Sequence, residues 1–307
     1  MQYVIGIDGG GTKTHAILAD ETGKVILESF GGPSNFLMLG TQVVSDTIYN
    51  LILQTLTEAN TSINDLSTIL LGTTGAGRRT DAERLENDFN SYLQNKEVKN
   101  VKFFVESDAR IALEGAFSGK AGSILIAGTG SIMFGKDSSD NVYRVGGFGR
   151  FIGDEGSGYS IGKKGLVAAS KCFDGRGRET LLKQLLNERC NIESTDLLIT
   201  EIYKNNFDIA SFAPVVLEAA SKGDPVSVSI VEEESSELVL HIKAMKNKIS
   251  DRPFYLSLIG GILSSENILS QKFIEKTVIE FDDVIIKEKD FSPAYGAVLM
   301  ALKKIEL

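Results

Sequence analysis

A carboxylate, a run of three glycines and a hydroxyl residue follow one another near the start of the chain. Asp8 ends an apolar run, Gly10 and Gly11 lie in the glycine run after it, and Thr12 and Lys13 come next. Backbone N–H groups of a glycine-rich turn can bind phosphate oxygens, and a carboxylate beside them can hold a hydrated Mg²⁺. These residue types indicate a nucleotide phosphate site. Lys13 would either neutralise phosphate or lie exposed in the loop.

The glycine run fits neither of the two common phosphate-loop patterns. A P-loop that starts at Gly6 reaches Gly11 correctly, but Thr12 follows where the pattern needs lysine. A dinucleotide fingerprint that starts at Gly9 needs glycine where Thr14 stands. Both patterns also need a helix after the loop, whereas "THAILADETGKVILESF" alternates apolar and polar residues around a turn. The loop is therefore predicted to join two strands of a β-hairpin.

The same arrangement occurs a second time, at residues 123–147. "SILIAGTGSIMFGKDSSDNVYRVGG" again gives a strand, a Gly-Thr-Gly-Ser loop, a strand, a polar turn and a strand. Its turn at Asp137 to Asn141 corresponds to the turn at Asp20 to Lys24. The repeat predicts a duplicated domain in which each half carries its own phosphate hairpin.

Two further carboxylates lie at predicted strand or loop ends. Asp108 follows "VKFFVES" and precedes a helix, which is where α/β folds place their sites. It could accept the proton of an attacking hydroxyl, or it could cap the helix. Asp154, with Glu155, lies in "GGFGRFIGDEGSG" before a second helix. The glycines favour close contact with a ligand, although acidic residues at a helix start also interact with the helix dipole.

An asparagine and a glycine pair complete the polar set. Asn35 in "GGPSNF" can donate and accept at once, which suits a pair of ligand hydroxyls, or it is a turn asparagine after proline. Gly260 and Gly261 follow the buried strand "FYLSLI". They would let a flat ligand lie against the backbone, or they form a turn into a helix.

Taken in order and spacing, these motifs resemble the N-acetylglucosamine kinase family. This family belongs to the BadF/BadG/BcrA/BcrD-type ATPase group of the sugar kinase, heat-shock protein 70 and actin superfamily. The resemblance rests on seven motifs: "GIDGGGTKT" at 6–14, "GGPSNF" at 31–36, "ESDARIA" at 106–112, "AGTGS" at 127–131, "GGFGRFIGDEGSGYSIG" at 146–162, "LIGG" at 258–261 and "SPAYGAVLMA" at 292–301.

The resemblance implies an α/β fold of two ribonuclease-H-like (actin-like ATPase) domains with an interdomain cleft. Residues 1–117 plus 291–307 would form the N-terminal domain, and residues 118–290 the C-terminal domain. It also implies ATP and Mg²⁺ as cofactors, with in-line transfer of the γ-phosphate to a sugar hydroxyl. N-acetylglucosamine is the first expected substrate, followed by N-acetylmuramic acid and glucosamine. The 6-hydroxyl is the implied acceptor, and transfer to the 1-hydroxyl stays open.

The resemblance gives each matched residue a role. Asp108 would be the catalytic base and Asp8 the metal ligand through water. The sugar would contact Asn35, Gly130, Ser131, Gly147, Phe148 and Asp154. ATP would contact Gly10, Gly11, Thr12, Lys13, Gly128, Thr129, Gly260 and Gly261. Phe148 stands where the human-type enzyme has tryptophan, so the shape of the N-acyl pocket is left open.

Composition limits the other functions. The net charge is −9 and no basic cluster stands out, which argues against nucleic acid or an acidic membrane as partner. No apolar run reaches the ~18 residues of a membrane span, and no signal peptide precedes the first strand, so a cytoplasmic protein is predicted. The two cysteines are expected to be ordinary thiols, and two histidines exclude a histidine-rich metal site. A homodimer is plausible, but no motif supports it.

Two other classes and two local details complete the predictions. An activator ATPase would carry cysteines for an iron–sulfur cluster, and a sugar-sensing regulator would carry a basic DNA-binding segment.

Thr80 and Glu83 are expected to form a capping box at a helix start. The acidic run Glu232 to Glu234 is expected to be solvated on a long amphipathic helix, and the last helix is expected to start at Ala294.

Overall fold

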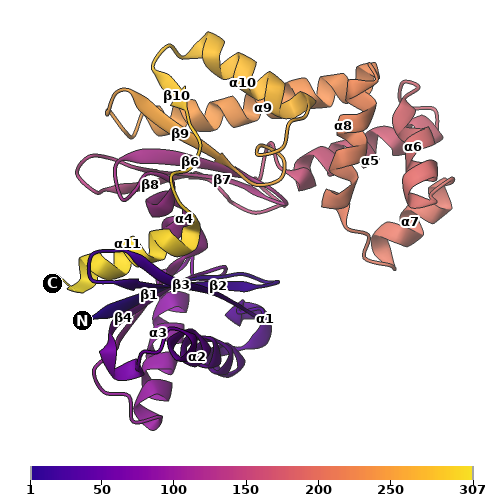
Figure 1. Cartoon of the computed structure of the whole chain (residues 1–307). Helices are drawn as coiled ribbons and strands as arrows, with labels where there is room; N and C mark the ends of the chain where they lie inside the picture. Colours follow the sequence, from indigo (N-terminus) through magenta and orange to yellow (C-terminus); the bar gives the residue numbers. More distant parts are fainter. Residues whose placement is uncertain (1, 306–307) are drawn as a thin grey trace. The chain divides into compact units, whose positions relative to one another are not determined.

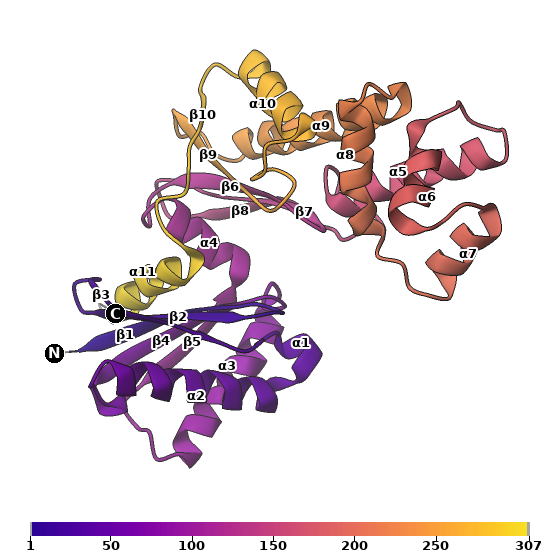
Figure 2. The ribbon, with the colours of Figure 1, turned by 45° about the vertical axis from the view of Figure 1, so that its right-hand side comes forward.

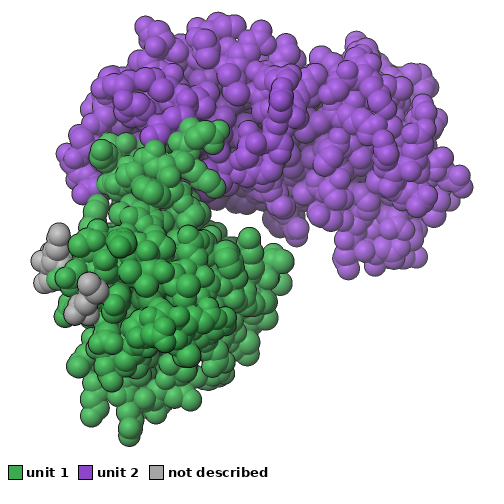
Figure 3. All heavy atoms as spheres, viewed as in Figure 1, with its two compact units in different colours: residues 1–121, 288–307 green, residues 122–287 purple. Residues whose placement is uncertain are grey.

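The computed structural model describes residues 2–305 and divides into two compact units. Unit 1 comprises residues 1–121 and 288–307, and unit 2 comprises residues 122–287 (Figure 3). Unit 1 is therefore built from both ends of the chain. The predicted functional division, with bounds 1–117 plus 291–307 and 118–290, stays a prediction. No helix within residues 2–305 is long and apolar enough to cross a membrane.

The sheet of unit 1 starts with two antiparallel hairpin connections. Its strands are β1 (Tyr3–Gly9), β2 (Thr14–Asp20), β3 (Val25–Gly31), β4 (Leu66–Thr73) and β5 (Lys102–Ser107). Their order is β3-β2-β1-β4-β5, with β2 antiparallel to β1 and β3, and with β4 parallel to β1 and β5. The first glycine loop thus joins β1 to β2, as the alternating pattern after it predicts.

Helices cover both faces of this sheet (Figures 1 and 2). They are α1 (Phe36–Leu39), α2 (Thr41–Glu58), the 3₁₀ turn η1 (Ile63–Asp65), α3 (Arg79–Asn95), α4 (Asp108–Ala116) and α11 (Pro293–Ile305). Alternate residues of β1 point to opposite faces, so Ile5 joins the core under α2 and α3, while Val4 joins the core under α4 and α11. A Cβ at Gly6 would overlap the backbone of Ala294, so glycine lets α11 lie directly on β1.

The sheet of unit 2 repeats the topology of unit 1. Its strands are β6 (Gly122–Ala127), β7 (Ser131–Lys136), β8 (Val142–Gly146), β9 (Phe254–Ile259) and β10 (Val284–Ile286). Read as β8-β7-β6-β9-β10, two antiparallel pairs are followed by two parallel pairs, as in the first sheet. The β2–β3 and β7–β8 turns also match. The Oδ1 atom of Asp20 accepts the N–H groups of Thr22 and Lys24, and that of Asp137 accepts those of Ser139 and Asn141.

Seven helical elements complete unit 2. They are α5 (Gly158–Phe173), α6 (Leu181–Cys190), α7 (Thr195–Tyr203), the 3₁₀ turn η2 (Ile209–Phe212), α8 (Ala213–Ser221), α9 (Pro225–Lys246) and α10 (Ile268–Glu280). Helix α9 contacts β7, β8 and α10, while α5 contacts α6, α8, α9 and η2. The strands and helices share one hydrophobic core, which includes Met133, Ile161, Leu238 and Phe273. Helix α9 therefore bridges the sheet and the helical part of this unit.

Two predicted helix starts need correction. Helix α3 begins at Arg79, after Arg78, and no side chain caps it, so the capping box of Thr80 and Glu83 is wrong. Thr80 already lies inside the first turn, where Glu83 instead pairs with Arg79 at 2.9 Å. Helix α11 begins at Pro293, one residue before the predicted start. Proline fits the first helical position because no intrahelical partner is available there for an N–H group.

Candidate functional site

The first glycine loop presents open backbone and is fixed by residues behind it. The N–H of Gly10 donates to the carbonyl of Lys13 at 3.1 Å, which closes the turn. Thr12 and Lys13 are exposed at its tip. The N–H of Ser34 donates to the carbonyl of Gly10 at 3.0 Å, and the buried Thr14 hydroxyl donates to Ser34 Oγ at 2.7 Å. This support by Ser34 was not predicted from the sequence.

Asp8 ends β1 beside this loop, and its surroundings suit a cation. Burial raises the pKa of its carboxyl, and the charge of Asp108 raises it further, while His15, Lys13 and Lys289 oppose the shift. A cation near two mutually repelling carboxylates would stabilise both charged forms. No group of three or more His, Cys, Asp and Glu side chains within residues 2–305 could hold a metal. Asp8 thus offers one carboxylate to a cation, which would suit a hydrated ion.

Asp108 begins α4 directly after β5. The alternative that it caps this helix is wrong, because the hydroxyl of Ser107 is the cap and accepts the N–H of Arg110 at 3.1 Å. Asp108 Oδ2 accepts the hydroxyl of Thr74 at 2.8 Å, and Oδ1 accepts the N–H of Ala109 at 2.8 Å. The carboxylate is half-buried and has a fixed orientation. A proton acceptor needs such an orientation.

Thr74 is a site residue that the sequence analysis missed. It follows β4, which pairs with both β1 and β5, so the ends of the three parallel strands bring Asp8, Thr74 and Asp108 to one edge of the sheet. In the sequence, Thr74 is marked only by its place directly after the buried run "LSTILLGT" at residues 66–73, which does not reveal its partner Asp108.

Asn35 combines a structural and a potential binding role. Its Oδ1 accepts the N–H of Leu37 at 3.1 Å and thereby caps α1, so the turn interpretation holds for this oxygen. Within residues 2–305, its Nδ2 has no hydrogen-bond partner. The amide nitrogen is thus a donor that a ligand hydroxyl could use.

The second glycine loop is bonded to the start of α5. The N–H of Gly128 donates to the carbonyl of Gly130 at 2.9 Å, which closes the turn. The carbonyls of Gly128 and Thr129 accept the N–H groups of Gly158 and Tyr159 at 2.7 and 3.1 Å. Thr129 itself is exposed. The loop therefore has a rigid base and an open tip, as a phosphate loop requires.

The predicted adenosine motif lies against this loop. Gly260 has φ +94°, and a Cβ there would overlap the carbonyl of Ala127. The N–H of Ile262 donates to the same carbonyl at 3.1 Å. No atom would obstruct a Cβ at Gly261 within 4 Å, so its backbone faces open space. The structure thus brings Gly260 and Gly261 next to Gly128.

Asp154 adopts a left-handed backbone conformation with φ +63°, which aspartate tolerates better than most residues other than glycine. Its carboxylate lies against Gly130, where a Cβ would be 2.8 Å from Oδ2. The buried hydroxyl of Ser131 donates to the carbonyl of Glu155 at 2.6 Å. Ser131 therefore holds the Asp154 loop against the second hairpin.

A cavity of 510 Å³ opens beside Asp154. Thr129, Gly130, Tyr159 and Arg150 also line it, so predicted phosphate and sugar residues share one space. Gly147 and Phe148 lie at the start of the same loop and do not line this cavity. Gly147 has φ +69° and packs against Ile132, and the side chain of Phe148 is 69% exposed.

The predicted solvation of the acidic run of α9, Glu232 to Glu234, needs correction at one residue. Glu232 and Glu233 are partly exposed, but Glu234 is fully buried, so the prediction of a solvated run is wrong at this position. Glu234 lies on the helix face that also buries Val231 and Leu238. Its charge is tolerated there because Lys164 of α5 pairs with it at 2.6 Å.

Comparison with known proteins adds full-length matches. The model of the BadF/BadG/BcrA/BcrD ATPase family matches residues 5–301. An N-acetylmuramic acid/N-acetylglucosamine kinase of Clostridium acetobutylicum is 38% identical over 98% of both chains, and an N-acetyl-D-glucosamine kinase of Dictyostelium discoideum is 28% identical over 98% of both. A solved structure from Chromobacterium violaceum, provisionally assigned as an N-acetylglucosamine kinase, has a TM-score of 0.74 at 23% identity, with 98% of this chain and 99% of that one covered.

These findings confirm the predicted resemblance and the predicted actin-like ATPase fold. They group the chain with amino sugar kinases along its whole length. The chain belongs to the BadF/BadG/BcrA/BcrD ATPase family.

Proposed function

We propose that the protein phosphorylates an amino sugar with ATP and that Asp108 is the general base. The observation that carries this proposal is the state of Asp108: a half-buried carboxylate at a strand end, oriented by Thr74 and not consumed as a helix cap. The relatives from Clostridium acetobutylicum and Dictyostelium discoideum support the reaction class.

In the proposed step, the Asp108 carboxylate takes the proton of the sugar hydroxyl as its oxygen attacks the γ-phosphorus of ATP. A bond forms between the sugar oxygen and phosphorus. The bond from phosphorus to the bridging oxygen breaks, and ADP leaves with the electron pair. Phosphoryl transfer depends mainly on positioning and charge stabilisation, and a base of this kind adds about 10²–10⁴-fold.

The two glycine loops would bind the phosphates of ATP. The open N–H group at Gly11 and the hydroxyls of Thr12 and Thr129 are the proposed donors, with Lys13 as a nearby positive charge. Gly128, whose own N–H donates to Gly130, would let the phosphates approach the backbone of the second loop. Asp8 would hold Mg²⁺ through water, and the ion would neutralise charge on the phosphate oxygens. Gly10 belongs to the first of these loops.

The adenosine of ATP would lie against Gly260 and Gly261. For the sugar, we propose hydroxyl contacts from the amide nitrogen of Asn35 and from Asp154, with Gly130 beside it. Ser131 would act by holding the loop of Asp154. Gly147 and Phe148 remain proposed contacts of the N-acyl group.

Arg150 supports N-acetylmuramic acid as a substrate besides N-acetylglucosamine. This sugar differs from N-acetylglucosamine by a lactyl ether that ends in a carboxylate. Arg150 lines the cavity beside Asp154, and its guanidinium lies over the rings of Phe151 and Tyr159 at 5.2 and 5.7 Å. No carboxylate of residues 2–305 forms an ion pair with it. A guanidinium of this kind could pair with a substrate carboxylate.

Purified protein with ATP and Mg²⁺ should convert N-acetylglucosamine, N-acetylmuramic acid or glucosamine to a sugar phosphate, with one ADP formed per phosphate transferred. Asp108→Asn should lower kcat by about 10²–10⁴-fold. Asp88→Asn, which changes an exposed carboxylate of α3, is the matched control and should leave kcat unchanged. If the rate of ATP hydrolysis is the same with and without each sugar, and the purified protein contains iron, the result would instead support an activator ATPase.

The substrate range is tested by Arg150→Gln. It should raise the KM for N-acetylmuramic acid by about tenfold and leave the KM for N-acetylglucosamine within about twofold, because only the first sugar carries the carboxylate. Arg178→Gln, an exposed arginine elsewhere in unit 2, is the control. Equal increases in the KM values for both sugars would show that Arg150 does not distinguish between them.

A further inference from the structure

The loop that carries Asp154, residues 146–156, is held at both ends by one face of α9. Glu234, Leu238 and His241 occupy this face, at the spacing of one face of a helix. At the end of the loop, a Cβ on Gly156 would overlap the side chain of Leu238. At its start, a Cβ on Gly146 would overlap the ring of His241. Both glycines have positive φ, at +77° and +70°, so the contacts come with backbone that favours glycine.

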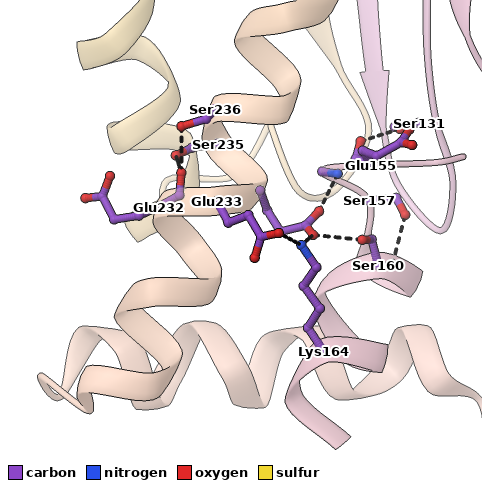
Figure 4. A network of polar contacts seen from close by, with 11 residues as sticks. Ser131, Glu155, Ser157, Ser160, Lys164, Glu232, Glu233, Ser235 and Ser236 are labelled. Carbon is purple, nitrogen blue, oxygen red and sulfur yellow. Dashed lines mark hydrogen bonds and ion pairs between the residues drawn. The ribbon is translucent and has the colours of Figure 1, made fainter. Parts of the chain in front are cut away.

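Glu234 makes the polar contacts of this face. Its Oε2 accepts the N–H of Gly156 at 2.5 Å, two residues after Asp154. Its Oε1 accepts the hydroxyl of Ser160 at 2.8 Å and pairs with the ammonium of Lys164 at 2.6 Å. Figure 4 shows Lys164 reaching from α5 towards the acidic run, with Ser160 beside it. One fully buried carboxylate thus joins the loop, α5 and α9.

Because Glu234 is buried, its carboxylate depends on these contacts for stabilisation. A buried carboxylate is costly unless its oxygens are hydrogen-bonded or paired, and all contacts of Glu234 that meet this need involve the loop or the first turns of α5. Burial alone would lower the pKa of the Lys164 ammonium, but its hydrogen bonds to Glu233 and Glu234 outweigh this effect, so the pKa of Lys164 is raised.

The start of α5 has anchors that do not depend on Glu234. The hydroxyl of Ser157 caps the helix by accepting the N–H of Ser160, and the carbonyls of Gly128 and Thr129 hold the N–H groups of Gly158 and Tyr159. The phosphate loop therefore keeps its own bonds when Glu234 changes. The loop of Asp154 would lose the bond at Gly156.

We propose that Glu234 is a positioning residue that sets the Asp154 loop for the sugar and has little effect on ATP. This inference rests on the proposed sugar kinase activity and extends it to a residue remote from the substrate. Glu234 contacts neither Asp154 nor the cavity beside it. It acts through the backbone of Gly156.

The test compares Glu234→Ala and Glu234→Gln with the neighbouring controls Glu233→Ala and Glu233→Gln. Glu233 also pairs with Lys164, at 2.8 Å, but its side chain is 61% exposed and it forms no hydrogen bond with the loop. Glu234→Ala should raise the KM for the amino sugar by about 10- to 100-fold, with the KM for ATP within about twofold. Glu234→Gln should recover most of the sugar KM, because its amide oxygen can still accept the N–H of Gly156. Both Glu233 variants should resemble the unchanged protein.

Hydrogen exchange followed by mass spectrometry separates loop positioning from a general loss of folding. In Glu234→Ala, deuterium uptake should rise in residues 146–157, while uptake in the strands of both units stays unchanged. Three outcomes would each overturn the proposal. The first is deuterium uptake that rises throughout unit 2, and the second is an equal increase in the KM values for sugar and ATP. The third is a Glu234→Gln variant whose sugar KM is raised as much as that of Glu234→Ala. If the unchanged protein phosphorylates no amino sugar, the proposed function fails. The exchange pattern would then still decide whether Glu234 holds the loop.

Discussion

At the scale of single residues, the candidate site combines charges that oppose folding with contacts that orient them. Asp8 and Asp108 repel each other, and burial adds to the cost of the charged form of Asp8. Within residues 2–305, the Asp8 side chain has no hydrogen-bond donor to offset that cost. Such strain is expected where a cation and phosphates are to be bound, because the ligands supply the missing stabilisation.

The stability cost of Asp8 gives a pH-dependent prediction. The pKa of Asp8 is raised above its ordinary value of 3.8, so protonation of Asp8 stabilises the folded state. This contribution to the free energy of unfolding is fully present below pH 3.8 and is lost as the pH rises through the raised pKa. At pH 7 without Mg²⁺ or ATP, Asp8→Asn should therefore raise the Tm, and the difference should shrink towards pH 4. Its kcat should fall by about 10²-fold or more. A lower Tm than that of the unchanged protein at pH 7 would contradict the prediction, and Asp88→Asn is again the control.

The sequence revealed single residues only where their neighbours in the chain form a pattern. Asp8, Asp108 and Asp154 follow apolar runs or glycines, so their positions at strand and loop ends could be predicted. Thr74 and Glu234 could not, because their roles depend on partners distant in the sequence, Asp108 and Gly156. An acidic run on a helix is usually solvated, and only the packing of α9 against α5 shows that Glu234 is buried.

At the scale of elements, buried carboxylates connect helix ends in unit 2. Asp224 caps α9 by accepting the N–H and the hydroxyl of Ser227 at 2.9 and 2.7 Å. It also accepts the hydroxyl of Thr180 and the N–H of Leu181, at 2.8 and 3.1 Å, at the start of α6. Burial alone would raise the pKa of Asp224, but these hydrogen bonds outweigh it and the pKa is lowered. One side chain thus fixes the starts of α6 and α9 together.

Asp224→Ala should lower the free energy of unfolding by about 2–4 kcal/mol, since it removes a helix cap and leaves buried donors without an acceptor. Denaturation in urea measures this loss. Ser194→Ala removes the hydroxyl that caps α7, and should cost about 1 kcal/mol or less. Equal costs for the two variants would show that Asp224 acts only as a cap. The KM for the sugar should not change in either variant.

The hairpins and long helices could be predicted because each is determined by local periodicity. Period-two alternation after each glycine loop gave β2 and β7, and apolar spacing gave α5 and α9. The start of α3 could not be predicted in the same way. Several polar residues precede it, and each could end the preceding loop, so the sequence does not distinguish Arg79 from Asp81 as the first helical residue.

At the scale of the whole molecule, one topology occurs twice. The two sheets share strand order and direction, and their outer turns are closed by aspartates with the same hydrogen bonds. Each copy has a glycine loop between its first two strands. The units differ in the other candidate site residues that they supply: unit 1 carries Asp8 and Asp108, whereas unit 2 carries Asp154 and the glycine pair at 260–261.

Unit 1 closes only with α11, which contributes Ala294, Val298 and Ala301 to the core over β1 and β4. These residues come from the last part of the chain, after all of unit 2. In chain order, unit 2 is therefore complete before unit 1 receives its last layer, and the apolar face of the unit 1 sheet stays uncovered until α11 packs onto it. Purified chains that end before residue 293 should resist protease in unit 2 and be cut within unit 1. Unit 1, although it holds the first residues of the sequence, is thus the later of the two units to complete its core.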